Sequence, residues 1–243
     1  MNYLLTLKYN GSGYHGWQRQ ENALTVQECV ENAVYRLFGE RVSVTGCSRT
    51  DTGVHANCFK CNFRTEKEIA LNKIITGMNY FLPDDIVVTA SETVGDDFNA
   101  RFDCKAKEYI YKIHNGQVRD PFLLNTAYFH KYHLDAQLMN GQAKDFIGTY
   151  DFSSFCAAGA TVKTTVRTVF DAGVERDGDM VIFRVTGDGF LYNMVRIMVG
   201  TLIYISEGKI EKGSIPEIIE SKNRLRAGKT AAPEGLYLNK VIY

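Results

Sequence analysis

The chain has 243 residues, of which 45% are hydrophobic and 23% charged, as in ordinary globular proteins. Lys and Arg together number 28, as do Asp and Glu, so the formal net charge is zero and excludes a uniformly basic surface. A basic cleft balanced by an acidic face would give the same sum, so a localised nucleic-acid site stays open. No apolar run is long enough to cross a bilayer and no signal-peptide pattern is present, so the expected compartment is the cytoplasm.

The first hundred residues predict the order strand, helix, two strands, helix, strand. The helix begins after Thr25, a residue type that caps helix N-termini, and its apolar residues recur at helical spacing up to about Phe38. Strands are expected at residues 3–9, 42–46, 55–63 and 86–91, and a second helix at 69–81.

A similar order returns after residue 104. Asp135 is the expected cap of a helix that runs to about Ile147, and Asp177-Gly178 is the turn of a predicted hairpin. The remaining elements are strands at residues 105–114, 166–175, 180–187 and 236–243, and an apolar helix at 193–206.

This repeated order predicts an α+β fold of two RRM-like or ferredoxin-like halves, with a mostly antiparallel sheet and a central catalytic cleft. Residues 1–104 are expected to form an N-terminal α/β subdomain, and residues 105–243 a C-terminal one.

Cys58 and Cys61 have the C-x-x-C spacing that metal and redox sites use. They lie in the strand predicted at 55–63, where residues three apart point to opposite faces. No second C-x-x-C completes a tetrahedral zinc site, so buried free thiols are predicted. A thiol or zinc protein built on this pair is kept as an alternative.

Residues 46–56 read Gly-Cys-Ser-Arg-Thr-Asp-Thr-Gly-Val-His-Ala, a polar turn between two strands. Arg49 and Asp51 are two residues apart and can share one side of an extended chain, while Gly53 allows a backbone angle that other residues avoid. On composition alone, this is either a carboxylate displayed beside a cation or an ordinary surface turn with an incidental ion pair.

The order Arg-Thr-Asp-x-Gly-Val-His-Ala resembles the motif of the TruA family of tRNA pseudouridine synthases. One departure is Ser48, where the motif usually has Gly; serine fits only if this position needs no positive φ. Further blocks that resemble the family follow in the family's order at residues 9–18, 25–27, 98–102, 106–111, 151–155, 189–196 and 233–236.

The resemblance implies an isomerase that converts uridine to pseudouridine in the anticodon stem-loop of tRNA, at positions 38–40. The target base must leave its stack to react. No electrons are gained or lost overall, so no redox cofactor is required, and the histidines form no metal-ligand pattern, so no metal is predicted. The resemblance also implies a homodimer that holds one RNA across both subunits.

The resemblance assigns Asp51 as the catalytic carboxylate, which acts as nucleophile or base. Arg49 would keep this carboxylate ionised and orient it. Tyr109 would stack on the extruded uracil, and Leu236 would pack against the base. Arg196, inside an apolar helix, would either meet an anion or snorkel to solvent.

Two alternatives concern the role of RNA. In a non-catalytic RRM-like RNA-binding protein, Tyr109 and Tyr111 would stack bases on an exposed sheet. In a paralogue, the enzyme would modify other RNA positions.

Several basic residues are candidates for phosphate contacts: Arg19, Arg64, Arg101, Lys209, Lys212, Lys222, Arg224, Arg226 and Lys229. Glutamates interrupt the C-terminal group, so an ordinary solvated face fits it equally well.

Overall fold

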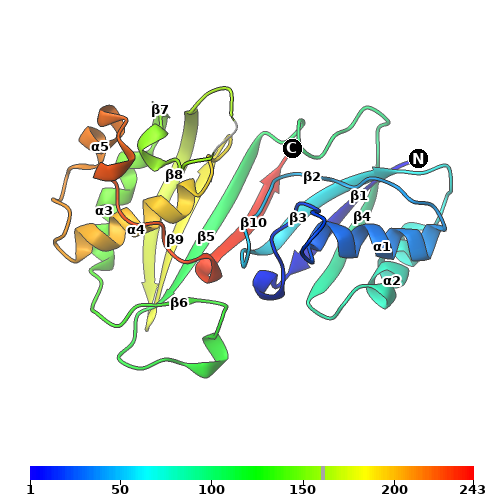
Figure 1. Cartoon of the computed structure of the whole chain (residues 1–243), viewed down its shortest axis with the longest axis horizontal. Coiled ribbons are helices and arrows are strands. Elements are labelled where there is room, and N and C mark those ends of the chain that lie inside the picture. Colours follow the sequence, from blue (N-terminus) through cyan, green and yellow to red (C-terminus); the bar gives the residue numbers. More distant parts are fainter. Residues whose placement is uncertain (160–161) are drawn as a thin grey trace. The chain divides into compact units, whose positions relative to one another are not determined.

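The computed structural model describes residues 1–159 and 162–243. The chain divides into two compact units: Met1–Lys105 together with Tyr237–Tyr243, and Ala106–Leu236 (Figure 1). Both units combine helices with a mostly antiparallel sheet, which confirms the predicted α+β fold with two repeated halves. The sequence predicts a single boundary near residue 104. In the structure the last seven residues also belong to the first unit. No helix of the described residues is long and apolar enough to span a membrane.

In the first unit, strand β1 lies between β4 and β3 and is antiparallel to both. The other edge of β3 pairs with β2 at Cys61–Asn62 and with β10, in parallel, at His55–Ala56. β2 is shorter than the strand predicted at 42–46. The elements are β1 (Asn2–Tyr9), α1 (Val26–Phe38), β2 (Thr45–Gly46), β3 (His55–Arg64), α2 (Leu71–Phe81), β4 (Ile86–Val94) and β10 (Leu236–Ile242).

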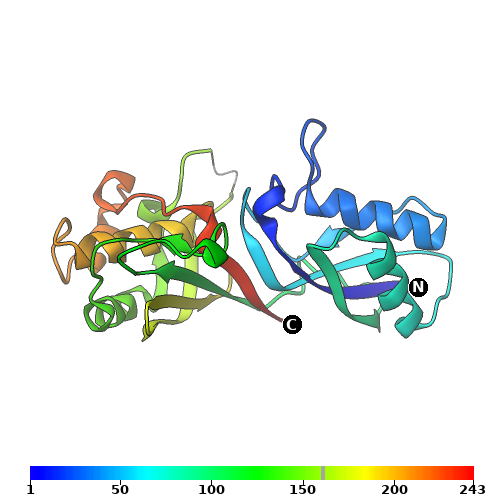
Figure 2. The same cartoon turned by 90° about the horizontal axis from the view of Figure 1, so that it is seen from below.

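The core of the first unit joins α1 to its sheet through aromatic rings. Tyr3 on β1, Phe38 at the end of α1 and Phe63 on β3 are all buried, with ring centroids 5.3–5.9 Å apart. Thr25 caps α1 as predicted, and Gly39 ends it with a φ of +70°. Helix α1 also packs against α2 (Figure 2). The predicted helix at 26–38 is therefore confirmed at both ends.

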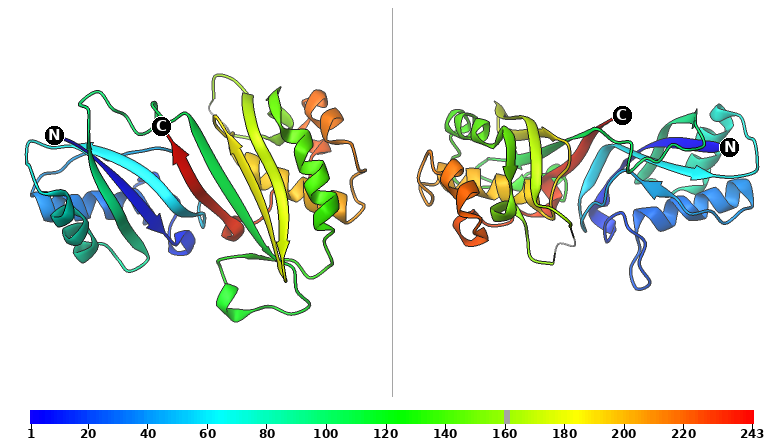
Figure 3. Two further views of the ribbon diagram at one scale, coloured as in Figure 1. Left: turned by 180° about the vertical axis from the view of Figure 1, so that it is seen from behind. Right: turned by 90° about the horizontal axis from the view of Figure 1, so that it is seen from above.

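In the second unit the strand order is β5-β9-β8-β7, all antiparallel, and β6 pairs in parallel with β5. Helix α4 lies over one face of this sheet (Figures 1 and 3). The elements are β5 (Ala106–His114), β6 (Tyr128–Phe129), α3 (Ala136–Ala143), β7 (Gly148–Asp151), β8 (Val166–Asp177), β9 (Met180–Gly187), α4 (Met194–Ser206) and α5 (Ile215–Ser221).

One predicted helix is shorter than expected. Asp135 does cap α3, by accepting a hydrogen bond from the backbone N–H of Leu138. The α-helix ends at Ala143, however, and a 3-10 turn over Lys144–Phe146 replaces its predicted last turn. Strands β6 and β7 and helix α5 were not predicted, because so few residues do not establish a hydrophobic period.

Candidate active site

Asp51 lies on the loop of residues 47–54 that joins β2 to β3. The backbone N–H of Val54 donates to the Asp51 carbonyl at 3.1 Å, which closes a tight turn, and Gly53 adopts a φ of +78° there. Asp51 is half-buried, whereas Arg49 is exposed. Ser48 does not adopt a positive φ, so serine replaces the usual motif glycine without backbone strain.

Residues of the opening motif, 9–18, hold this loop in place. The backbone N–H of Trp17 donates to the Thr50 carbonyl at 3.2 Å. The hydroxyls of Tyr9 and Thr50 are hydrogen-bonded at 2.9 Å in a buried contact. On the other side of Asp51, the N–H of Gly53 donates to the Tyr14 carbonyl at 3.2 Å. The backbone on both sides of Asp51 is therefore tied to one neighbouring segment.

Two glycines of the opening motif make this close approach possible. Gly16 has a φ of +80°, and a Cβ at that position would lie 2.2 Å from the Thr50 carbonyl oxygen. A Cβ on Gly11 would lie 1.9 Å from the Val54 carbonyl oxygen. Only a residue without a side chain fits at either position. The sequence indicates this segment as a turn after the first strand and as a block that resembles the family, but not its contact with the loop of Asp51.

Aromatic packing supports the same loop from β3. The ring of Trp17 stacks on Phe59 with centroids 4.1 Å apart, and both side chains are buried. His55, the first residue of β3, stacks on Tyr237 at 4.5 Å, and its Nδ1 accepts from the N–H of Gly11 at 3.0 Å. The end of β3 that follows Asp51 is therefore held by side-chain packing and by a backbone donor.

Tyr109 lies on β5 in the second unit, opposite Val185 on β9. Its side chain is also buried, and its ring meets Phe190 edge-on, with centroids 5.2 Å apart. Tyr111, two residues along, is fully buried and donates from its hydroxyl to the Ala232 carbonyl at 2.6 Å. Burial raises the pKa of the Tyr111 hydroxyl well above its ordinary value. Tyr111 is thus a core residue, which removes one ring of the base-stacking platform that an RRM-like binder would expose.

Arg196 lies in the first turn of α4 and its guanidinium is held by neighbouring groups. Nε donates to the Ala231 carbonyl and Nη1 to Asn193 Oδ1, both at 2.7 Å. The backbone N–H of Ala231 in turn donates to the Arg196 carbonyl at 3.0 Å. These bonds fix the side chain close to its own helix instead of letting it extend freely into solvent. Leu236, five residues after Ala231, begins β10 and is buried.

The five site residues predicted from the sequence fall into two groups. Asp51 and Arg49 share one loop of the first unit, while Tyr109, Arg196 and Leu236 belong to the second. Each group comes from segments that resemble the family's motifs.

Comparison with known proteins identifies the family. A sequence model described as tRNA pseudouridine synthase matches residues 6–103 and 142–243. The chain belongs to this family. It is 48% identical over 242 residues to tRNA pseudouridine synthase A of Acetivibrio thermocellus and 47% identical to that of Clostridium acetobutylicum. Each comparison covers 100% of this chain and 99% of the relative. The resemblance seen in the motifs is confirmed, and the enzyme isomerises uridine to pseudouridine in tRNA.

The six cysteines of the synthase are free thiols. Cys61 is fully buried on β3, and burial raises the pKa of its thiol well above the ordinary value. Cys58, three residues earlier on the same strand, is half-exposed and points to the other face. Within residues 1–159 and 162–243, no three His, Cys, Asp or Glu side chains are grouped to hold a metal ion. The zinc alternative therefore has no site in the described part of the chain.

Several basic residues of the synthase that are candidates for phosphate contacts are already paired with carboxylates. These ion pairs are Lys209 with Glu207 at 2.7 Å, Lys222 with Asp151 at 3.2 Å and Arg226 with Glu217 at 3.3 Å. Arg224 donates to the Gly228 carbonyl at 2.9 Å. Three ion pairs and one bond to a backbone carbonyl favour an ordinary charged surface for these four residues.

Proposed function

We propose that the synthase modifies uridines in the anticodon stem-loop of tRNA, at positions 38–40, and that Asp51 is its catalytic carboxylate. The bond between ribose C1′ and uracil N1 breaks, the base turns, and a bond forms between C1′ and C5. The C5 proton leaves to solvent and N1 gains a proton, so atoms and electrons balance without a redox cofactor. Asp51 acts as nucleophile at the ribose or the base, or as the base that removes a sugar proton.

The observation that carries this proposal is the anchoring of Thr50, the residue before Asp51. Its carbonyl accepts a hydrogen bond from Trp17, and its hydroxyl is bonded to buried Tyr9. A reacting carboxylate gains rate from being held in one geometry, because displacements near 1 Å cost up to about a hundredfold. A surface turn with an incidental ion pair has no need of buried anchors on the residue next to its carboxylate.

The proposal gives each of the other predicted site residues the role that the family resemblance implies. Arg49, on the same loop, orients the Asp51 carboxylate. Arg196, whose guanidinium is fixed by Asn193 and Ala231, supplies a second positioned cation. Tyr109 stacks on the extruded uracil and Leu236 packs against it, which offsets part of the few kcal/mol that base flipping costs.

The proposal also includes a cytoplasmic homodimer with one tRNA held across both subunits. The family resemblance supports both parts. Sedimentation of the synthase alone and with tRNA tests the dimer: two chains per tRNA are expected, and a one-to-one complex of monomers would contradict it.

The decisive experiment compares Asp51→Asn and Asp51→Ala with the control Asp97→Asn, which neutralises an exposed aspartate of the same unit. Isomerisation is followed by the release of tritium from C5 of uracil in tRNA, and tRNA binding by gel shift. We expect neither Asp51 variant to release tritium although both bind tRNA, while the control keeps normal activity. Release by either Asp51 variant would exclude the proposed role. Pseudouridine mapping in tRNA from cells without the gene tests positions 38–40.

A further inference from the structure

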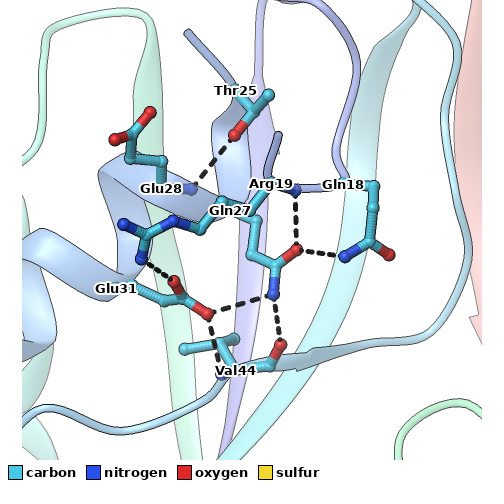
Figure 4. A network of polar contacts seen from close by, with 7 residues as sticks. All are labelled: Gln18, Arg19, Thr25, Gln27, Glu28, Glu31 and Val44. Atoms are coloured by element: carbon cyan, nitrogen blue, oxygen red, sulfur yellow. Dashed lines mark hydrogen bonds and ion pairs between the residues drawn. The ribbon is translucent and has the colours of Figure 1, made fainter. Parts of the chain in front are cut away.

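The side-chain amide of Gln27, in the first turn of α1, is buried and makes four hydrogen bonds (Figure 4). Its Oε1 accepts from the backbone N–H of Arg19 at 2.9 Å and from Nε2 of Gln18 at 3.0 Å. Its Nε2 donates to Glu31 Oε1 and to the Val44 carbonyl, both at 3.0 Å. Two acceptor and two donor positions are all an amide has, so its capacity is fully used.

Glu31, one helical turn after Gln27, completes the network. Its Oε2 pairs with Nη1 of Arg19 at 2.9 Å, and its Oε1 accepts from the backbone N–H of Val44 at 3.2 Å. Residues four apart on a helix are neighbours on one face, so the pair acts from a single position on α1. It binds both backbone polar groups of Val44 and also the segment Gln18–Arg19, although these two segments are far apart in the sequence.

Both segments are connected to the loop of Asp51, the first by a hydrogen bond and the second along the chain. Trp17 precedes Gln18, donates to the Thr50 carbonyl, and accepts at its own carbonyl from the Gln27 backbone N–H at 3.0 Å. Val44 precedes β2, after which the chain enters the loop of residues 47–54. Gln27 therefore holds the segment that anchors Thr50 and also the strand from which the loop begins.

We propose that Gln27 is a positioning residue of the isomerisation, which holds the Asp51 loop through residues 17–19 and 44–46. The inference rests on the proposed role of Asp51. A merely structural role for Gln27 would affect the free energy of unfolding but leave the rate of the folded enzyme unchanged. A positioning role lowers that rate, since small displacements of the reacting group slow the reaction steeply.

The test replaces Gln27 by Met, which has a similar volume and makes none of the four hydrogen bonds. The first-order rate of tritium release with saturating enzyme is expected to fall roughly 10- to 100-fold. The dissociation constant for tRNA should change little, because the amide of Gln27 is buried and carries no charge. Rates are compared at a temperature where circular dichroism shows each variant fully folded.

Asn115 provides a matched control in the second unit. It is equally buried, and its amide also makes four hydrogen bonds. These join it to the carbonyls of His130 and Tyr132, the N–H of Leu134 and Nη2 of Arg176. Asn115→Leu should lower the melting temperature, as Gln27→Met does, without changing the rate of the folded enzyme. An equal loss of rate in both variants would overturn the proposal.

A pair of exchanges keeps the test usable if Gln27→Met does not fold. Gln27→Glu places two carboxylates next to each other at positions 27 and 31, where they repel, and should slow the reaction. Adding Glu31→Gln returns a donor between these positions, and partial recovery of the rate is expected; its absence in a folded double variant would contradict the proposal.

Asp51→Asn in the same assay separates the two proposals. An active Asp51→Asn refutes the catalytic role of Asp51. An inactive Asp51→Asn, together with a wild-type rate for Gln27→Met, refutes the positioning role alone.

Discussion

Replacing Gly16 by Ala tests how strictly the opening motif sets the position of Asp51. Gly16 has a φ of +80°, where an L-residue with a side chain pays roughly 1–2 kcal/mol. The new methyl carbon would lie 2.2 Å from the Thr50 carbonyl oxygen and 3.1 Å from the carbonyl carbon of Asp51. Both atoms belong to the backbone, so the overlap cannot be relieved by rotating a side chain.

The distances give the size of the effect. Ordinary contact begins at 3.4 Å, so the Thr50 carbonyl oxygen must move by about 1.2 Å, the difference between 3.4 and 2.2 Å, and the adjoining carbonyl carbon of Asp51 by at least about 0.3 Å. A shift of about 1 Å in a reacting group costs up to about a hundredfold in rate. The backbone angle and the overlap together should lower the free energy of unfolding by about 2–5 kcal/mol, since overpacking alone costs about 1–3 kcal/mol.

The assay is tritium release at saturating enzyme, with the free energy of unfolding measured by urea titration. Gly13→Ala is the matched control, because Gly13 lies in the same motif, has no positive φ, and would place its Cβ no closer than 4.0 Å to its nearest neighbour. We expect Gly16→Ala to lose both rate and stability and Gly13→Ala to keep them. A folded Gly16→Ala enzyme with the wild-type rate would refute the reasoning that Thr50 holds Asp51 in place.

Two further predictions concern the second unit. The hydrogen bond from Thr165, supported by Lys222, lowers the pKa of Asp151 to about 2. A lowered carboxyl pKa stabilises the fold above the unfolded value of about 3.9, and this contribution is lost as pH falls toward 2. Urea titrations should therefore find Asp151→Asn about 1 kcal/mol less stable than wild type at pH 6, after allowance for solvent screening, and equally stable near pH 2; a difference that persisted at pH 2 would contradict this. Gly200→Ala should prevent stable folding of the second unit, because the new Cβ would lie 1.8 Å from the carbonyl oxygen of Lys229, on the segment next to α4. A normal melting curve for this variant would contradict the prediction and show that the segment can move aside.

The sequence predicts the longer elements of this fold well, because their signals are local. Helix α1 begins at the Thr25 cap and ends at Gly39, and both signals act within one turn of the helix. The hairpin of β8 and β9 turns at Asp177–Met180 around its Asp-Gly pair. β6, β7 and α5 cannot be predicted from local sequence, because their stability comes from neighbours that are distant in the sequence.

The candidate site likewise combines features that the sequence predicts with features that only the structure shows. The order of residues around Asp51 identifies the family, and with it the isomerisation of uridine in tRNA. It does not show that Ser48 needs no positive φ, or that Tyr111 is a core residue bonded to Ala232 and not a base-stacking ring. For Arg196 the sequence allows either binding of an anion or snorkelling to solvent, because its bonds to Asn193 and Ala231 depend on how α4 packs.

The fold class, the long helices and strands, the family and the candidate site residues can therefore all be predicted from the sequence. Only the folded structure shows the contacts around the loop of Asp51, namely the close passage at Gly11 and Gly16 and the buried Tyr9–Thr50 contact, and the four bonds of Gln27 to neighbouring segments. The physical reason is distance along the chain. Caps, turns and hydrophobic periods act between residues a few positions apart, whereas Tyr9 and Thr50 are 41 residues apart and meet only when β1 and β3 pair.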